Sequence, residues 1–234
     1  MFRRFANFIH LRLFVLPRLR RSYKNLSVAE TFQTIYRTKI WGGQEELFCS
    51  GPGSRGIAAD KYCESIIGFI RDNKIQTVVD LGCGDFMVGK KIVDATGIRY
   101  TGIDIVPDLI AHLKNTVQNP RVNFECLNIM NDALPKADLY LVRQVLQHLS
   151  NEEILKVLDN LGKKSKILIA EDVPIRPKSF NRNKAHGPDI RSFYGSGIYI
   201  DKAPFSIPIE TEWRFPLSDS TLLRMTLIDQ TGAN

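Results

Sequence analysis

Long apolar runs are missing from this chain, and its composition is not that of a fibrous or disordered protein. A membrane-spanning helix needs about 20 predominantly apolar residues, whereas the best N-terminal run, Leu13 to Leu16, ends at Pro17. Glycine and proline account for only 16 and 11 of the 234 residues, and 44% of the residues are hydrophobic. We therefore expect neither an integral membrane protein nor a collagenous or disordered chain, but one large domain with an apolar core.

Cysteine is scarce, and the four cysteines are widely spaced. Cys49, Cys63, Cys83 and Cys126 form no Cys-x-x-Cys pair of the kind that zinc sites use. A secreted chain of this length would seldom place its cysteines inside strand-like apolar segments. We therefore expect reduced, mostly buried thiols, no metal site and a cytoplasmic location.

Acidic residues are absent from the first 29 positions, which carry seven Lys and Arg side chains. The whole chain has 32 basic and 25 acidic residues, so residues 30–234 are balanced and the net charge of +7 lies in the N-terminal segment. A neutral body argues against a nucleic acid as partner. We expect an N-terminal extension over residues 1–29 and one domain over residues 30–234.

The extension has a moderately amphipathic pattern. On a helix, five apolar side chains within residues 1–24 share one stripe: Phe2, Phe5, Ile9, Leu13 and Leu16. Three roles fit an Arg-rich apolar helix: peripheral contact with the inner face of a membrane, targeting to an organelle, or packing on the body or on a second subunit. The sequence leaves these three roles and the oligomeric state open.

From Ile75 onward, short β-branched runs alternate with stretches of helical apolar spacing. The predicted strands are Thr77–Leu81, Tyr100–Ile105, Val122–Leu127, Leu139–Val142, Ile167–Ala170 and Thr221–Ile228. The predicted helices are Val88–Thr96, Pro107–Val117 and Asn151–Leu161, the last of them capped by Ser150. This alternation predicts an α/β fold with a doubly wound, mostly parallel, Rossmann-like sheet, and a ligand site at the carboxyl ends of its strands.

Residues 174–220 break the alternation, because they are rich in proline, glycine and arginine. An irregular segment of this length inside a compact domain is uncommon and often functional. We interpret it as a lid over the site, with a surface excursion as the alternative. Its basic residues either hold an anionic group, such as a sugar acid, a phosphate or a carboxylate, or form a solvated loop: Arg176, Arg182, Lys184, Arg191 and Lys202.

The strongest local motif runs from Val78 to Phe86, where a predicted buried strand leads into a glycine turn and a helix. Gly82 and Gly84 let the backbone approach a bulky ligand. A dinucleotide-binding loop would need a third glycine at position 87, where Met stands, and this argues against a nicotinamide dehydrogenase. The carboxylate of Asp80 ahead of the turn suits a cationic or amino-bearing ligand.

With Asp80, Gly82 and Gly84, the turn resembles the first motif of the class I S-adenosylmethionine-dependent methyltransferases. It departs from that motif at Phe86, where a third glycine often stands. Asp104 lies 24 residues after Asp80, at the end of the next predicted strand. By the same resemblance, Asp104 matches the acid that binds the two ribose hydroxyls of the cofactor, a role for a bidentate acceptor.

Three further segments extend this resemblance. Asn128 replaces the usual Asp beside the adenine amino group, from which its amide oxygen can still accept a hydrogen bond. Residues 137–149 resemble the strand-to-helix segment that these methyltransferases have beside the cofactor. Trp41 lies in an aromatic and Ser/Gly-rich stretch that is similar to one in some small bacterial methyltransferases. Trp41 either covers the sulfonium group or is a core residue. The resemblance implies S-adenosyl-L-methionine as cofactor, bound by Asp80, Gly82, Cys83, Gly84, Asp104, Ile105, Asn128, Ile129, Arg143 and Trp41.

Methyl transfer to a hydroxyl group requires alignment, exclusion of water and a base. His148, five residues after Arg143 on a predicted helix, is the best candidate for the base, because a neutral imidazole accepts a proton near neutral pH. The alternative is a histidine on the helix surface, or one that contacts the reacting groups only through another residue. Asp172, after the fifth predicted strand, is the second catalytic candidate.

We therefore expect an S-adenosylmethionine-dependent methyltransferase that methylates a hydroxyl of a small molecule or of a saccharide or glycan. Two alternatives stay open. One is a non-catalytic S-adenosylmethionine-binding protein, which the departures at Phe86 and Asn128 allow. The other is an RNA methyltransferase that uses the basic extension as an arm.

Overall fold

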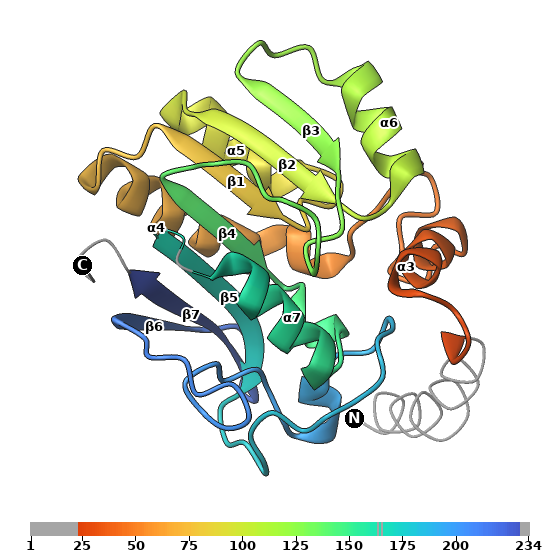
Figure 1. The fold of residues 1–234 in the computed structure, drawn as a ribbon, viewed down its shortest axis with the longest axis vertical. Coiled ribbons are helices and arrows are strands. Elements are labelled where there is room, and N and C mark those ends of the chain that lie inside the picture. The colour runs from red at the N-terminus through yellow and green to blue at the C-terminus, as the bar shows by residue number, and fades with distance from the viewer. Residues whose placement is uncertain (1–22, 163, 165, 230–234) are drawn as a thin grey trace.

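The computed structural model describes residues 23–162, 164 and 166–229, so the predicted N-terminal extension lies almost entirely outside the described residues. Within the described part, seven strands form one sheet in the order β3-β2-β1-β4-β5-β7-β6 (Figure 1). Strands β1 to β5 are parallel, and β7 runs antiparallel to both β5 and β6. The strands are β1 Thr77–Leu81, β2 Arg99–Asp104, β3 Val122–Cys126, β4 Leu139–Arg143, β5 Lys166–Pro174, β6 Thr211–Pro216 and β7 Thr221–Asp229.

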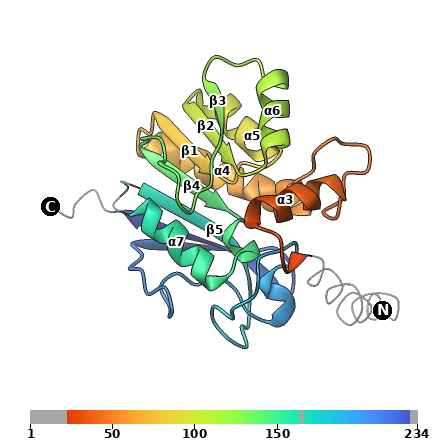
Figure 2. The ribbon, with the colours of Figure 1, turned by 45° about the vertical axis from the view of Figure 1, so that its right-hand side comes forward.

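Alternate residues of the central strands face two apolar layers, as the period of two along a strand requires. Val78 belongs to the layer formed with α4, α5 and α6, and Val79 belongs to the layer formed with α7. Figure 2 shows α7 in front of the sheet and α4 and α5 behind it. The helices are α3 Val28–Arg37, α4 Gly56–Asp72, α5 Met87–Thr96, α6 Pro107–Thr116 and α7 Asn151–Leu161. The predicted doubly wound, mostly parallel α/β fold is therefore confirmed.

The segment between β5 and β6 is not only a surface loop. Its buried side chains Ile198, Ile200 and Phe205 complete the apolar layer that α7 begins. A short 3-10 turn, η4, spans Arg191–Tyr194. Much of the predicted lid therefore covers the sheet rather than the ends of its strands.

Strand β6 corrects the prediction of an irregular segment up to residue 220. It pairs with β7 at the edge of the sheet, where Trp213 and Phe215 pack on the first apolar layer and Glu212 binds Arg224. Sequence analysis missed this strand because charged residues alternate with the two aromatic ones, a pattern that one-sided burial at a sheet edge permits.

Helix α7 begins at Asn151 because Ser150 caps it. The Glu153 amide donates to Ser150 Oγ (3.2 Å), and the Ser150 amide donates to Glu153 Oε2 (2.7 Å), which is a capping box. The residues before the cap form a separate 3-10 turn, η3 (Leu146–His148). His148 therefore lies on this short 3-10 helix between β4 and α7, and not on an α-helix.

Strand β5 also differs from its prediction, because it continues four residues further, to Pro174. The continuation pairs with β7, from Glu171 opposite Arg224 to Pro174 opposite Thr221. Asp172 consequently lies within the strand and not after it.

None of the helices in the described part of the chain has the length and apolar character that crossing a bilayer requires.

Phe86, which stands where the resembled motif often has a third glycine, has a backbone conformation that favours glycine. Phe86 precedes α5 with φ +64°, in the left-handed region that favours glycine. Its ring is buried between Tyr100 (centroids 5.3 Å apart) and Phe124 (5.1 Å, edge to face). Packing of the ring thus offsets a backbone conformation that costs a non-glycine residue about 1–2 kcal/mol.

We predict that Phe86→Ala loses about 3–5 kcal/mol of unfolding free energy, since it removes the ring and keeps the strained backbone. Phe86→Gly removes the same ring but relieves the strain, so it should be about 1 kcal/mol more stable than Phe86→Ala. Urea unfolding of the two variants measures this difference. A glycine variant no more stable than the alanine variant would contradict the assigned strain.

Candidate functional site

A cavity of about 280 Å³ lies at the carboxyl ends of β1, β2, β4 and β5. Helix α3, the loop before α4 and residues 188–193 close its other sides. All twelve residues expected to bind the cofactor or to act in catalysis line this one cavity: Trp41, Asp80, Gly82, Cys83, Gly84, Asp104, Ile105, Asn128, Ile129, Arg143, His148 and Asp172. The sheet thus brings together residues up to 131 positions apart.

The glycine turn after β1 needs both of its glycines. Gly82 and Gly84 have φ values of +81° and +55°. A side chain at Gly82 would lie 2.3 Å from Val145 Cγ2, and one at Gly84 would lie 2.2 Å from Ser50 Oγ. The turn is therefore packed between η3 on one side and the Ser/Gly loop on the other.

Asp85 fastens the Ser/Gly loop to the glycine turn. Its Oδ2 accepts hydrogen bonds from the Ser50 amide (2.9 Å) and from Arg55 (3.0 Å), and its own amide donates to Ser50 Oγ (2.7 Å). Tyr36 of α3 shares a further hydrogen bond with Ser50 Oγ (3.0 Å). These bonds hold α3 and residues 50–54 across the mouth of the cavity.

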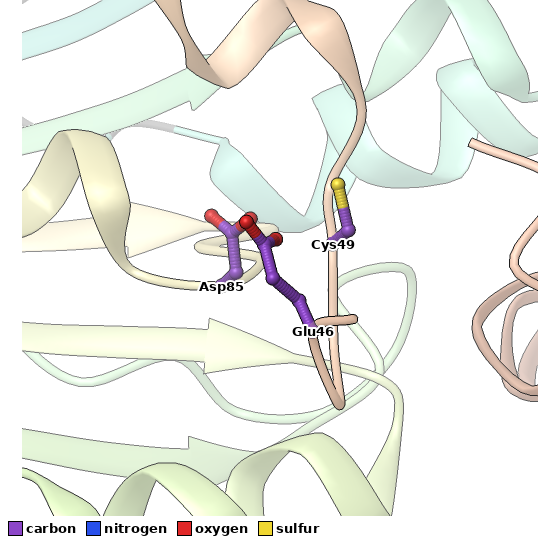
Figure 3. Close-up of side chains that lie close together, drawn as sticks. All are labelled: Glu46, Cys49 and Asp85. Atoms are coloured by element: carbon purple, nitrogen blue, oxygen red, sulfur yellow. The ribbon is translucent and has the colours of Figure 1, made fainter. Parts of the chain in front are cut away.

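Glu46, Cys49 and Asp85 lie close together beside this loop, and Figure 3 shows the carboxylates of Glu46 and Asp85 next to each other, with Cys49 beside them. Arg55 already binds the two carboxylates, at 2.5 Å from Glu46 and 3.0 Å from Asp85. The cluster is thus an ion-pair network organised by a guanidinium group.

The carboxylate of Asp104 joins the end of β2 to the glycine turn. Its Oδ2 accepts from the Gly84 amide (3.2 Å) and its Oδ1 accepts from the Val106 amide (3.1 Å). The side chain is buried, and burial raises its pKa to about 6 despite these backbone hydrogen bonds. Each oxygen retains a lone pair for a further donor.

Asp80 is the second buried carboxylate of the cavity. Tyr100 donates to its Oδ2 at 2.6 Å. Burial raises the pKa of Asp80 to about 6, and the hydrogen bond from Tyr100 and the charge of Arg143 oppose that rise. Two acids that titrate near pH 6 in one cavity are typical of a binding or catalytic site.

Arg143, at the end of β4, faces these acids. Its Nη2 donates to the Gly53 carbonyl, and its guanidinium lies over the Tyr62 ring, 4.9 Å from the centroid. Its Nε is buried and has no hydrogen-bond partner among the described residues. The guanidinium therefore has one buried N–H without an acceptor among the described residues.

Asn128 follows β3 and takes part in a tight turn. Its Oδ1 accepts from the Met130 amide (3.0 Å), and its backbone amide donates to Asp132 (2.7 Å). The side chain is fixed in orientation, and the second lone pair of Oδ1 is left for a ligand.

His148 lies among aromatic rings at the far end of the cavity. The centroids of Trp41 and Phe32 are 5.0 Å and 6.2 Å from the imidazole. Nδ1 lies 3.1 Å from the Gly187 carbonyl, which assigns the proton to Nδ1 and leaves Nε2 as the acceptor. Burial and the nearby charge of Lys184 lower the pKa of His148 to about 4, so the imidazole is neutral at pH 7.

Asp172 lies in the wall of the cavity beside Gln144. Gln144 Nε2 donates to Asp172 Oδ1 (2.9 Å), and burial raises the pKa of the carboxyl. Gln144 has φ +54° and donates its amide to Ala170 (2.8 Å), which turns the chain sharply after β4.

Sequence analysis missed Glu171 and Gln147. Glu171 is 1% exposed and accepts hydrogen bonds from the amides of Val145 (3.0 Å), Leu146 (2.8 Å) and Gln147 (3.2 Å). Burial raises its pKa to about 8. Glu171 therefore holds η3, and with it His148, in place. The sequence did offer a signal for Glu171, because an acid within a strand-like apolar run indicates a buried carboxylate with a specific role. It offers no such signal for Gln147.

The predicted anion-binding role of the lid is wrong for this cavity. None of its five basic residues lines the cavity. Lys184 and Arg191 are buried and bonded inward: Lys184 lies 3.4 Å from Asp189, and Arg191 donates to the Leu149 carbonyl (2.6 Å). These cations stabilise the segment, and a sequence gives no indication of which loop cations are buried.

Comparison with known proteins identifies the fold. Residues 78–165 match the family model of a methyltransferase domain. The chain is 23% identical over 183 residues to O-methyltransferase 4 of Dictyostelium discoideum, a match that covers 75% of this chain and 50% of that protein. The chain thus spans about half the length of this curated relative.

Solved structures agree on the architecture. The N-methyltransferase NodS of Bradyrhizobium japonicum, in complex with S-adenosyl-L-homocysteine, has a TM-score of 0.56 and 12% identity, over 84% of this chain and 98% of that one. Magnesium protoporphyrin IX methyltransferase of Synechocystis, with bound SAM, has a TM-score of 0.54 and 14% identity, over 86% and 97%. At these identities the likeness establishes the fold alone.

The buried carboxyls should make the free energy of unfolding depend on pH. A carboxyl whose pKa rises from 3.8 to about 6 on folding destabilises the fold progressively between about pH 4 and pH 6, because the unfolded chain ionises first. For Asp104 the loss between pH 5 and pH 7 is about 1 kcal/mol. We expect Asp104→Asn to remove that part of the fall in unfolding free energy, measured by urea titration at both pH values.

The exposed carboxyl of Asp219 provides the matched control. Asp219→Asn should leave the pH dependence of the wild type unchanged. The same pH dependence in all three proteins would show that Asp104 is not desolvated as the structure indicates.

Proposed function

We propose that this chain, a member of the class I S-adenosylmethionine-dependent methyltransferases, binds S-adenosyl-L-methionine in the cavity and transfers a methyl group to a hydroxyl of a small molecule. One observation carries the proposal. The residues of four strand-end motifs and a neutral histidine line the same cavity.

The donor set of the cavity fits the cofactor. Asp104 would accept from the ribose hydroxyls, and Asn128 would accept from the adenine amino group, with Ile105 and Ile129 on the apolar faces of the base. At the other end of the glycine turn, Asp80 suits the ammonium group of the amino-acid moiety. The guanidinium of Arg143, which also lines the cavity, suits its carboxylate.

The two glycines and Cys83 bring the backbone of the turn to the edge of the cavity. Trp41 lies beside His148, where its face would attract a sulfonium cation. These roles follow the resemblance residue by residue, and each is part of the proposal.

The protein's contribution to the reaction is a base in a dry, aromatic site. When bound, the cofactor would supply an electrophilic methyl group for the acceptor oxygen. His148 Nε2 would take the hydroxyl proton, and the Gly187 carbonyl holds the tautomer that permits this. Phe32 and Trp41 would exclude water from the reacting groups.

A small molecule fits this site better than a glycan. The wall around His148 is aromatic and aliphatic, and the lid cations that favoured an anionic saccharide lie outside the cavity. The match to a protein named O-methyltransferase 4 supports oxygen as the acceptor atom. We further propose that residues 30–234 form the methyltransferase domain and that residues 188–193 are the part of the predicted lid that covers the acceptor.

Calorimetric titration with S-adenosyl-L-methionine and S-adenosyl-L-homocysteine tests the cofactor. We expect saturable binding that is about 100-fold weaker in Asp104→Ala, since two charge-assisted hydrogen bonds are lost. The exposed control Asp219→Ala should bind as the wild type does. Wild-type protein without affinity for either compound would end the proposal.

The role of His148 can be separated from cofactor binding. We expect His148→Ala to lower kcat by 10²–10⁴-fold and to change the affinity for S-adenosyl-L-homocysteine less than twofold. With the cofactor saturating, kcat of the wild type should show no acid limb between pH 6 and pH 8, because a base with a pKa of about 4 is deprotonated throughout. His112→Ala, outside the cavity, is the control. An unchanged kcat in His148→Ala would exclude His148 as the base.

A further inference from the structure

His186, in the segment between β5 and β6, binds two elements that are far apart in the sequence. Its Nδ1 lies 2.6 Å from Glu153 Oε1 of α7, and its Nε2 lies 3.1 Å from the carbonyl oxygen of Leu26, just before α3. The side chains of His186 and Glu153 are only 18% and 16% exposed. The imidazole therefore joins α7 to the start of α3 in a place that is largely shielded from solvent.

The two partners of His186 define its charge. A carbonyl oxygen and a carboxylate oxygen can only accept hydrogen bonds, and a neutral imidazole has a single N–H. Although burial opposes ionisation of Glu153, hydrogen bonds from His186 and Ser150 hold the pKa of Glu153 below its ordinary value. Only the imidazolium form of His186 can therefore donate to both partners at once.

Two charged side chains among the described residues act on this imidazole from the elements around it. The hydrogen bond to Glu153 of α7 raises the pKa of His186, while burial and the charge of Lys184, in the same segment, oppose the rise. From the side of α3 the contact is the uncharged Leu26 carbonyl, and the net result is a pKa above the ordinary 6.5. The stabilisation from such a group is complete below pH 6.5 and is lost as the pH rises through the raised pKa.

The loss of one proton reverses the contact with Leu26. The remaining proton stays on Nδ1, because that nitrogen faces the carboxylate of Glu153. Nε2 then turns a lone pair toward the lone pairs of the Leu26 carbonyl oxygen, and the hydrogen bond between them is replaced by repulsion. Deprotonation of His186 thus affects the start of α3 and leaves the contact with α7.

Helix α3 is one wall of the cavity, beside the carboxyl ends of the strands (Figure 1). Val28, Phe32 and Tyr36 are its lining residues. Further along the helix, Arg37 forms an ion pair with Asp108 of α6 (3.3 Å), but the two side chains are 71% and 55% exposed, and such pairs contribute little. Release of the contact at Leu26 therefore leaves the start of α3 free to move away from the cavity.

We propose that Leu26, Glu153 and His186 form a proton-operated latch: the imidazolium holds α3 over the cavity, and loss of its Nε2 proton to solvent releases the start of the helix and opens the cavity to ligand exchange. The inference goes beyond the proposed function, because none of the three residues lines the cavity and the latch needs no bound cofactor.

Hydrogen exchange of the α3 amides, in the protein without ligand, measures opening of the helix. After correction for the intrinsic effect of pH on exchange, we expect the protection of residues 28–37 to fall about 10-fold from pH 6 to pH 8.5, as the loss of one hydrogen bond of about 1.4 kcal/mol implies. Helix α5 (Met87–Thr96) is the reference, because titration of other buried groups acts on both helices. An equal fall in α3 and α5, or no fall in α3, would overturn the latch.

Variants assign the effect to the imidazole. His186→Gln is neutral at every pH, so the protection of its α3 at pH 6 should already equal that of the wild type at pH 8.5. Glu153→Gln can still cap α7 but removes the charge that favours the imidazolium, so the fall should occur at a lower pH than in the wild type. His112→Gln, on α6, is the matched control and should keep the wild-type dependence. A wild-type pH dependence that persists in His186→Gln would exclude His186 as the titrating group.

Release of S-adenosyl-L-homocysteine, followed by stopped-flow fluorescence, tests the consequence for the cavity. At pH 6 we expect His186→Gln to release the compound about 10-fold faster than the wild type, and at pH 8.5 we expect equal rates. Comparison at a single pH keeps the cavity acids in the same ionisation state in both proteins. Equal rates at pH 6 would contradict control of access by the latch. Absence of binding would end the proposed function, whereas hydrogen exchange without ligand would still decide on the latch.

Discussion

Carboxylates that accept hydrogen bonds from backbone amides hold this site together. Asp104 binds the amides of Gly84 and Val106, Asp85 binds that of Ser50, and Glu171 binds three amides of η3. Asp104 ends β2, Asp85 follows β1 and Glu171 lies within β5, so each carboxylate joins the sheet to a neighbouring loop or short turn. The glycine turn, the Ser/Gly loop and the histidine turn thereby form the walls of one cavity.

The groups around the cavity lower the stability of the folded protein when no ligand is bound. Burial raises the pKa of Asp80 and Asp104 to about 6 and that of Glu171 to about 8. Phe86 and Gln144 have left-handed backbone conformations near the cavity. Buried atoms of Arg143 and Gln147 lack partners within the described residues. Two apolar layers over a seven-stranded sheet offset these costs, and several buried acids with raised pKa values beside one cavity are typical of a binding site.

Much of this organisation could be predicted from the sequence. Strand β1 and helix α7 have the predicted bounds because strong local signals define them, a β-branched run before a glycine turn and a Ser cap before an amphipathic stretch. The cavity residues were predictable because parallel strands end at one edge of the sheet. The resemblance added the expected role of each residue.

The remaining features depend on tertiary contacts. Strand β6 exists because β7 pairs with it, and the turn that carries His148 exists because Glu171 binds its amides. The burial of Lys184 and Arg191, which removes them from the candidate anion site, follows from carbonyl and carboxylate partners that are distant in the sequence or formed by the loop itself. Local patterns carry no information about such partners.

The central claim is that buried acids of this cavity bind the cofactor. Proton-linked calorimetry of S-adenosyl-L-homocysteine binding, in buffers of different ionisation enthalpy, tests it most directly. Carboxyls with a pKa of about 6 are half protonated at pH 6 and must ionise to accept from the ligand. Binding should release on the order of 0.5–1 proton at pH 6 and none at pH 8. Binding without proton release at pH 6, or no binding, would contradict the claim.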